Sequence, residues 1–199
     1  MAQAPELTDE IIAARRPGPG EGLPDDMPRW MARTITVIDT FSDRVGRVVS
    51  WMAIPLMLAM VFEVVARYAF TAPTVWAYDM SRMIYGAYFI LGAAYALSKG
   101  VHIRSDFLYR KWAYRTQGRV DTVLYVVFYF PAMIIFLWVA SKWAWTAMVR
   151  LERGMDTAWM PLLGPVRICL PIGIAFLLIQ GVSELLKGIH AARTGRWPE

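Results

Sequence analysis

Four long apolar runs dominate the sequence and limit the chain to a small set of folds. They cover about residues 45–70, 76–97, 120–145 and 165–186. Each run is about 20–26 residues long, and a helix needs about 20 residues to cross a hydrocarbon core of about 30 Å. Backbone groups surrounded by lipid must find hydrogen-bond partners within the segment, so such runs form helices. The pattern predicts an all-α membrane protein with four transmembrane helices.

Composition and charge agree with a membrane protein. Hydrophobic residues make up 57% of the chain, whereas soluble domains contain about 45–50%. The formal net charge is +5, which in a membrane protein reflects Lys and Arg in cytoplasmic loops. No basic stripe accompanies a nucleic-acid-binding motif, so we expect no nucleic-acid partner.

The segments outside the runs have different characters. Residues 1–28 are rich in Pro, Gly and charge, and we predict a disordered tail. Residues 29–190 form the predicted membrane domain, and 191–199 a second tail. Within residues 29–44, apolar side chains recur at helical spacing while Asp39 and Asp43 fall largely on other faces. This predicts an amphipathic helix that lies in the membrane interface or packs on a soluble partner. The spacing of Ile103, Phe107 and Trp112 predicts a second interfacial helix.

The distribution of Lys and Arg predicts the topology. These residues are concentrated before the first run, between the second and third runs, and after the fourth: Arg15, Arg16, Arg29, Arg33, Arg44, Lys99, Arg104, Arg110, Lys111, Arg115, Arg119, Lys187, Arg193 and Arg196. Cytoplasmic segments carry the excess of positive charge. We therefore expect both termini in the cytoplasm, with membrane lipids as partners of the interfacial helices.

Four charged residues near the first hairpin require an explanation, because charge in a membrane is costly. They are Glu63, Arg67, Asp79 and Arg82. Counting outward from the short turn predicts that Arg67 pairs with Asp79 and that Glu63 pairs with Arg82, in addition to the in-helix spacings. A structural clasp that fixes the hairpin is favoured over a proton or ion relay, since every charge has a partner. Lys142 and Glu184 lie nearer the ends of runs, and we interpret them as surface anchors.

The sequence offers little catalytic chemistry. It has one cysteine and two histidines, His102 and His190, and no HExxH, CxxC or phosphate-loop motif. We expect neither enzymatic activity nor a resident cofactor or metal. The two histidines lie beyond the ends of runs, so a membrane anchor of a respiratory complex that binds haem or quinone stays open as the alternative. No inverted repeat supports a solitary transporter, and a solitary channel is a third class.

One stretch resembles a known family. "FEVVARYAFTAPTVWAYDMSRMIYGAYFILGAAYALSKGVHIRSDFL" is similar to the small, DctQ-like membrane subunit of tripartite ATP-independent periplasmic (TRAP) transporters. The resemblance rests on "ARYAF", on a Trp and an acid that open the second run, on "LGAAYAL", and on the His-x-x-x-Asp pattern of His102 and Asp106. It covers about residues 35–190. The family often has Glu where this chain has Asp79.

The resemblance implies a heterocomplex in a bacterial inner membrane. A large multi-span subunit would carry the substrate and sodium sites and move as an elevator, while this subunit acts as a fixed scaffold. A periplasmic solute-binding protein would deliver an organic acid such as a dicarboxylate, and Arg150, Arg153 and Asp156 are candidate contacts with it. The alternative for this loop is a solvated turn. His102 and Asp106 would be cap or interface residues at the cytoplasmic side.

Overall fold

The computed structural model describes residues 23–24, 26–99 and 113–195. They form α2 (Arg29–Ser50), α3 (Ala53–Ala69), α4 (Ala77–Ser98), α6 (Tyr114–Leu124), the π-helix η1 (Tyr125–Tyr129), α7 (Phe130–Val149) and α8 (Gly164–Thr194). Over these residues the all-α prediction is confirmed. Most of the predicted N-terminal tail, the second interfacial helix, His102 and Asp106 lie outside the described residues.

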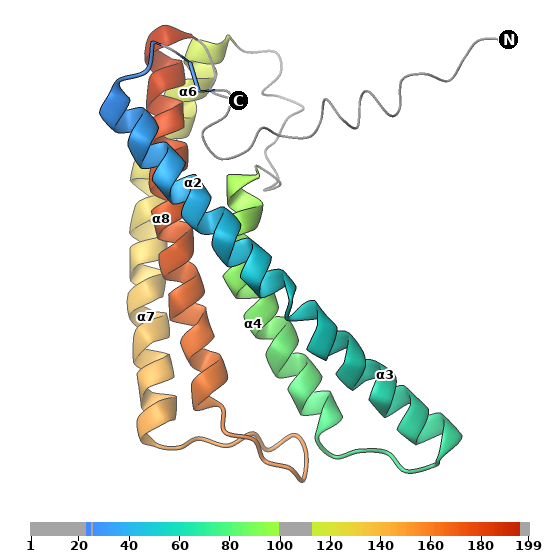
Figure 1. The fold of residues 1–199 in the computed structure, drawn as a ribbon. Helices are drawn as coiled ribbons and strands as arrows, with labels where there is room; N and C mark the ends of the chain where they lie inside the picture. The colour runs from blue at the N-terminus through green and yellow to red at the C-terminus, as the bar shows by residue number, and fades with distance from the viewer. Residues whose placement is uncertain (1–22, 25, 100–112, 196–199) are drawn as a thin grey trace, which may run out of the picture.

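The helices form two antiparallel pairs crossed by a fifth segment (Figure 1). α7 packs beside α8, and α3 beside α4, while α4 also packs on α8. α2 crosses both α8 and α4. We call the end that holds the starts of α2 and α6 and the end of α8 the terminal end. The opposite end, which holds residues 70–76 and 150–163, is the loop end.

Three helical stretches are long and apolar enough to cross a membrane: Arg29–Ala69, Tyr114–Val149 and Gly164–Thr194. The runs predicted at 120–145 and 165–186 lie within the second and third of these stretches. The bounds of α4 agree closely with the run predicted at 76–97. However, Asp79, Arg82 and four tyrosines lower its hydropathy, and α4 is not one of the three stretches.

The boundary between the amphipathic helix and the first run differs from the prediction. α2 continues to Ser50 rather than ending near residue 44, and a turn at Trp51–Met52 separates it from α3. The turn is tight: the N–H of Met52 bonds to the Val49 carbonyl at 2.9 Å, and the N–H of Ile54 to the Trp51 carbonyl at 3.2 Å. Pro55 has no N–H to continue the α-helical ladder onto Trp51, which accounts for the break.

Small residues bring the helices into close contact around α8. A Cβ at Gly173 would lie 2.7 Å from the backbone oxygen of Ile90 on α4, and a Cβ at Gly118 would lie 2.5 Å from the backbone nitrogen of Ala192. α7 buries Ala140, Ala144 and Ala147. Small residues let backbones approach where lipid supplies little hydrophobic driving force. α8, packed against α2, α4, α6 and α7, is therefore the central helix.

Candidate functional sites at the two ends of the bundle

Glu63 joins α3 to the loop that follows it. Its Oε1 accepts a hydrogen bond of 3.0 Å from Arg67 Nε, and its Oε2 accepts one of 3.0 Å from the backbone N–H of Thr74. The Thr74 hydroxyl donates to the same carboxylate. One acid on α3 thus holds both the last turn of its own helix and Thr74 in the segment leading to α4.

Asp79 and Arg82 join α4 to a different segment, the loop between α7 and α8. The Asp79 side chain is buried, and its Oδ2 accepts a hydrogen bond from the Thr157 hydroxyl. Arg82 lies 3.5 Å from Asp79 Oδ1 and forms an ion pair with Asp156. Asp79 also sits in the first turn of α4, where the helix dipole favours a negative charge.

The four charges pair only in part as predicted. The pairs expected from in-helix spacing are present, since Glu63 pairs with Arg67 and Asp79 with Arg82. Among the described residues, neither Arg67 with Asp79 nor Glu63 with Arg82 forms the ion pair expected across the hairpin. Counting residues from the turn gives depth but not the direction in which a side chain points, and a third segment supplies partners that the hairpin alone lacks.

The loop between α7 and α8 is braced rather than fully solvated. The N–H of Gly154 bonds to the Pro161 carbonyl, and the N–H of Leu163 to the Glu152 carbonyl, both at 2.9 Å. Arg167 at the start of α8 pairs with Glu152. Asp156, a predicted contact for a binding protein, is directed to Arg82, whereas Arg150 and Arg153 are exposed. The exposed surface of this loop also carries Met155, Trp159 and Met160.

A second polar cluster, which sequence reasoning missed, lies where α2 crosses α8. Asp39 Oδ1 accepts hydrogen bonds from Gln180 Nε2 at 2.9 Å and from Ser183 Oγ at 2.8 Å. Lys187 Nζ lies 2.9 Å from Asp39 Oδ2 and also 2.9 Å from Glu184 Oε1. Ser42 Oγ donates to Gln180 Oε1 at 2.6 Å. We call these residues the crossing cluster: Asp39, Ser42, Gln180, Ser183, Glu184 and Lys187.

The crossing cluster corrects one interpretation, because Glu184 is buried rather than a surface anchor. Asp39 lies off the predicted apolar face, as expected, and points into the bundle, where its partners are. A signal was present in the sequence. Gln180, Ser183, Glu184 and Lys187 follow the i, i+3, i+4, i+7 spacing, so they share one face of an otherwise apolar helix. Charges within a span face the bundle interior and pair there.

Most of the chain, including both loop-end ion pairs, resembles a known protein family. Residues 56–191 match the family model "Tripartite ATP-independent periplasmic transporters, DctQ component". This match covers well over half of the chain. The chain belongs to the DctQ family. A search of curated proteins finds no match. DctQ proteins are components of a transporter, so the family gives no support to the respiratory anchor.

The family match runs from α3 into α8 and leaves out α2. In this DctQ chain both loop-end ion pairs and the α8 side of the crossing cluster lie inside the matched region. Asp39 and Ser42 on α2 lie outside it. His190, inside the match, is buried and lies 3.6 Å from Asp26 Oδ1. His102, the other histidine considered for haem, is outside the described residues.

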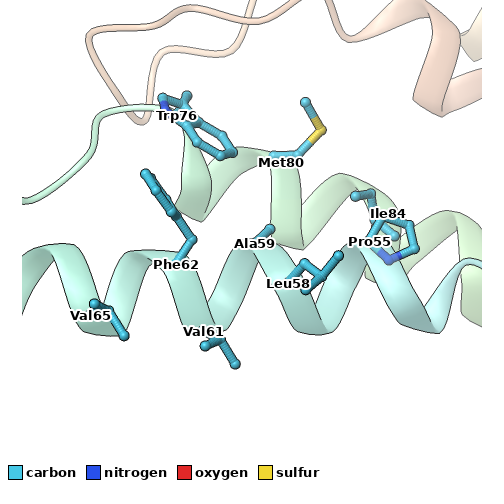
Figure 2. A pocket seen from close by; sticks show the side chains of 9 residues that line it. All are labelled: Pro55, Leu58, Ala59, Val61, Phe62, Val65, Trp76, Met80 and Ile84. Atoms are coloured by element: carbon cyan, nitrogen blue, oxygen red, sulfur yellow. The ribbon is translucent and has the colours of Figure 1, made fainter.

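An apolar groove of about 710 Å³ lies along the contact between α3 and α4 in this DctQ chain. Figure 2 shows Phe62 beside Trp76 at one end of the groove, and Pro55 near Ile84 at the other. The two aromatic rings stack with centroids 5.7 Å apart. Only Ala59 of α3 is buried, so the described bundle leaves most of this helix exposed.

Proposed function

We propose that this DctQ chain is the fixed scaffold of a TRAP-type secondary transporter in a bacterial inner membrane. It would hold a large elevator subunit during ion-driven, sodium-coupled uptake of organic acids such as dicarboxylates, delivered by a periplasmic binding protein. Residues 45–70 (the end of α2 with α3), α4, α6–α7 and α8 would form four spans, with both termini in the cytoplasm. The DctQ family match over residues 56–191 is the observation that carries the proposal.

The exposed face of α3 supports a large membrane partner. Its outward side chains are apolar along the whole helix: Ile54, Met57, Leu58, Met60, Val61, Phe62, Val64 and Val65. The groove against α4 gives this face a concave shape into which side chains of a neighbouring helix can pack. We therefore assign the α3 face and its groove to the large subunit.

The polar clusters support a rigid role. We propose that Glu63, Arg67, Asp79 and Arg82 act as a structural clasp that ties both loops of the loop end together, while the crossing cluster ties α2 to α8 at the other end. A scaffold for a moving neighbour needs helices that keep their relative positions. The crossing cluster is a largely buried side-chain network, and such networks supply rigidity, while the partly exposed loop-end contacts hold each loop to its helix.

The α7–α8 loop supports contact with a soluble partner. Arg150 and Arg153 are exposed, and the backbone around them is held by the Gly154–Pro161 hydrogen bond. We propose that these two arginines contact an acidic surface of the binding protein. Asp156 would contribute to this contact indirectly, because its ion pair with Arg82 fixes the loop on α4.

Purification of the tagged chain from its native membranes in mild detergent tests the scaffold proposal. A large, very hydrophobic transporter subunit should copurify in a fixed ratio. Leu58→Trp/Val65→Trp, which fills the groove, should reduce that recovery by at least about tenfold. The matched control is Ile135→Trp/Val139→Trp on the exposed side of α7, which should leave recovery unchanged. A flavin or iron–sulfur partner would contradict the proposal and favour the respiratory anchor.

A further inference from the structure

α2 carries two apolar stripes rather than one. The first packs into the bundle through Met31, Ile35, Gly46 and Val49. The second points away from it and consists of Trp30, Val37, Phe41, Val48 and Trp51. Trp30 is 63% exposed, and Val48 and Trp51 are each 71% exposed. The amphipathic face predicted for residues 29–44 therefore corresponds mainly to the outward stripe, which no described segment covers.

Four arginines lie along one side of the outward stripe. Arg29 and Arg47 directly precede Trp30 and Val48, and Arg33 and Arg44 each lie one helical turn before a stripe residue. All four are exposed. Arg47 pairs with Asp43 at 2.9 Å and stays 70% exposed. Arg29, Arg33 and Arg44 form no ion pair in the described part of the chain.

The acids of α2 neutralise little of this face, because the bundle engages both of them and only Arg47 pairs with one. Asp39 binds Lys187, Gln180 and Ser183 on α8. Asp43 lies 3.4 Å from Lys99 beside α4 as well as close to Arg47. The sequence alone shows acids and arginines mixed along one helix. The structure separates them, with carboxylates turned inward and guanidinium groups turned outward.

We propose that the outward face of α2 is a binding site for anionic phospholipids of the membrane surface. The apolar stripe enters the acyl region while the arginines contact headgroup phosphates. Guanidinium groups bind phosphate oxygens through paired N–H donors, and anionic lipids concentrate such basic helices at a membrane. Trp30 and Trp51, at the two ends of the stripe, are the residue type that anchors helices at the interface.

The outward face of α2 is long enough to bind several lipid headgroups. Arg29 and Arg47 are separated by about 27 Å at 1.5 Å per residue. α2 crosses α8 and α4 instead of running along them, as Figure 1 shows, and the Trp51–Met52 turn separates it from the apolar helix α3. α2 also lies outside the DctQ match, so the family does not assign it a partner. Lipid binding by the isolated chain is independent of the scaffold proposal.

The test uses the purified, delipidated full chain in a nonionic detergent. Native mass spectrometry would compare the apparent Kd for phosphatidylglycerol with that for phosphatidylcholine. Arg33→Gln/Arg44→Gln removes two arginines that have no ion-pair partner among the described residues, so the folding of this variant, followed by circular dichroism, should not change. The charge-matched control is Arg150→Gln/Arg153→Gln at the loop end. We expect the preference for phosphatidylglycerol to fall at least fivefold (about 1 kcal/mol) in the first variant only.

Four outcomes would overturn the proposal. In the first, the unmodified chain shows no preference for phosphatidylglycerol. In the second, both double variants lose that preference equally. In the third, inorganic phosphate at the same concentration displaces the lipid. A variant that keeps its lipid preference but no longer copurifies with the large subunit would assign the face to a protein instead. A preference that falls with rising salt supports the proposal, since the attraction is electrostatic.

Discussion

The hydroxyl of Thr157 donates a hydrogen bond to the buried carboxylate of Asp79, although 78 residues separate them in sequence. This contact closes the α7–α8 loop onto the first turn of α4. The neighbouring Arg82–Asp156 ion pair lies at the same junction. The loop end is consequently one connected unit rather than two independent turns.

Thr157→Val should destabilise the chain because it removes the donor and leaves a buried carboxylate oxygen unsatisfied. A loss of about 1–3 kcal/mol in the free energy of unfolding is expected. Thr157→Ser keeps the hydroxyl and should lose far less. Denaturant unfolding in detergent micelles would measure both. Equal stabilities of the two variants would show that the hydrogen bond contributes little.

A double-mutant cycle would distinguish the observed pairing from the one expected from residue counting. Arg82→Gln and Asp156→Asn should show a coupling free energy of about 0.5–1 kcal/mol, small because both side chains are about half exposed. Arg82→Gln and Glu63→Gln should be additive within about 0.5 kcal/mol. A larger coupling free energy for Arg82 with Glu63 than for Arg82 with Asp156 would instead favour the ion pair expected across the hairpin.

Lys187→Met should be among the most damaging single changes in the crossing cluster. It leaves Asp39 and Glu184 near each other without the cation that both contact. Removing one partner of a buried ion pair costs about 3–5 kcal/mol. Adding Asp39→Asn should recover part of the stability, because one of the two charges disappears. Thermal unfolding would measure these variants beside Lys142→Met, whose exposed lysine should matter little.

Gly173→Ala should weaken the contact between α4 and α8. The new methyl group would meet backbone atoms of Ile90, which cannot move aside as a flexible side chain would. Overpacking of this kind costs about 1–3 kcal/mol. Gly86→Ala on α4 is the matched control: no atom lies within 4 Å of its added Cβ, and the better helix propensity of Ala should stabilise it by up to about 1 kcal/mol. A reversed order of stabilities would contradict the assigned helix contact.

Much of the fold could be predicted from hydropathy, because lipid forces every long apolar run into a helix. The positions of α4, α7 and α8 follow from their runs in this way. The predicted end of the amphipathic helix near residue 44 was wrong. Apolar residues continue past this position, and only Pro55 signals the break between α2 and α3. The π-helix η1 just before Pro131 was also missed, because proline marks a disturbance of the ladder without specifying its form.

The polar sites were harder to predict than the helices. Periodicity identified an apolar face on residues 29–44, but α2 has a second one, and the deeper face is set by Gly46, whose added Cβ would lie 2.3 Å from the ring of Tyr95. Both acids of α2 are turned toward the bundle on this side of the helix. The partners of Asp39 and Asp79 come from α8 and from the α7–α8 loop, and no count along a single hairpin can reveal them.

The helix at the centre of the packing, α8, is made after all the other described helices. Until α8 is inserted, α4 and α6 lack the surface on which they pack, and Asp39 lacks Lys187. Before α8 is inserted, the earlier helices therefore lack a partner for the small residues that pack on α8 and for the Asp39 carboxylate. Packing of the described bundle therefore cannot be completed before α8 is inserted, and a chain that stops before α8 would leave Asp39 without its lysine partner.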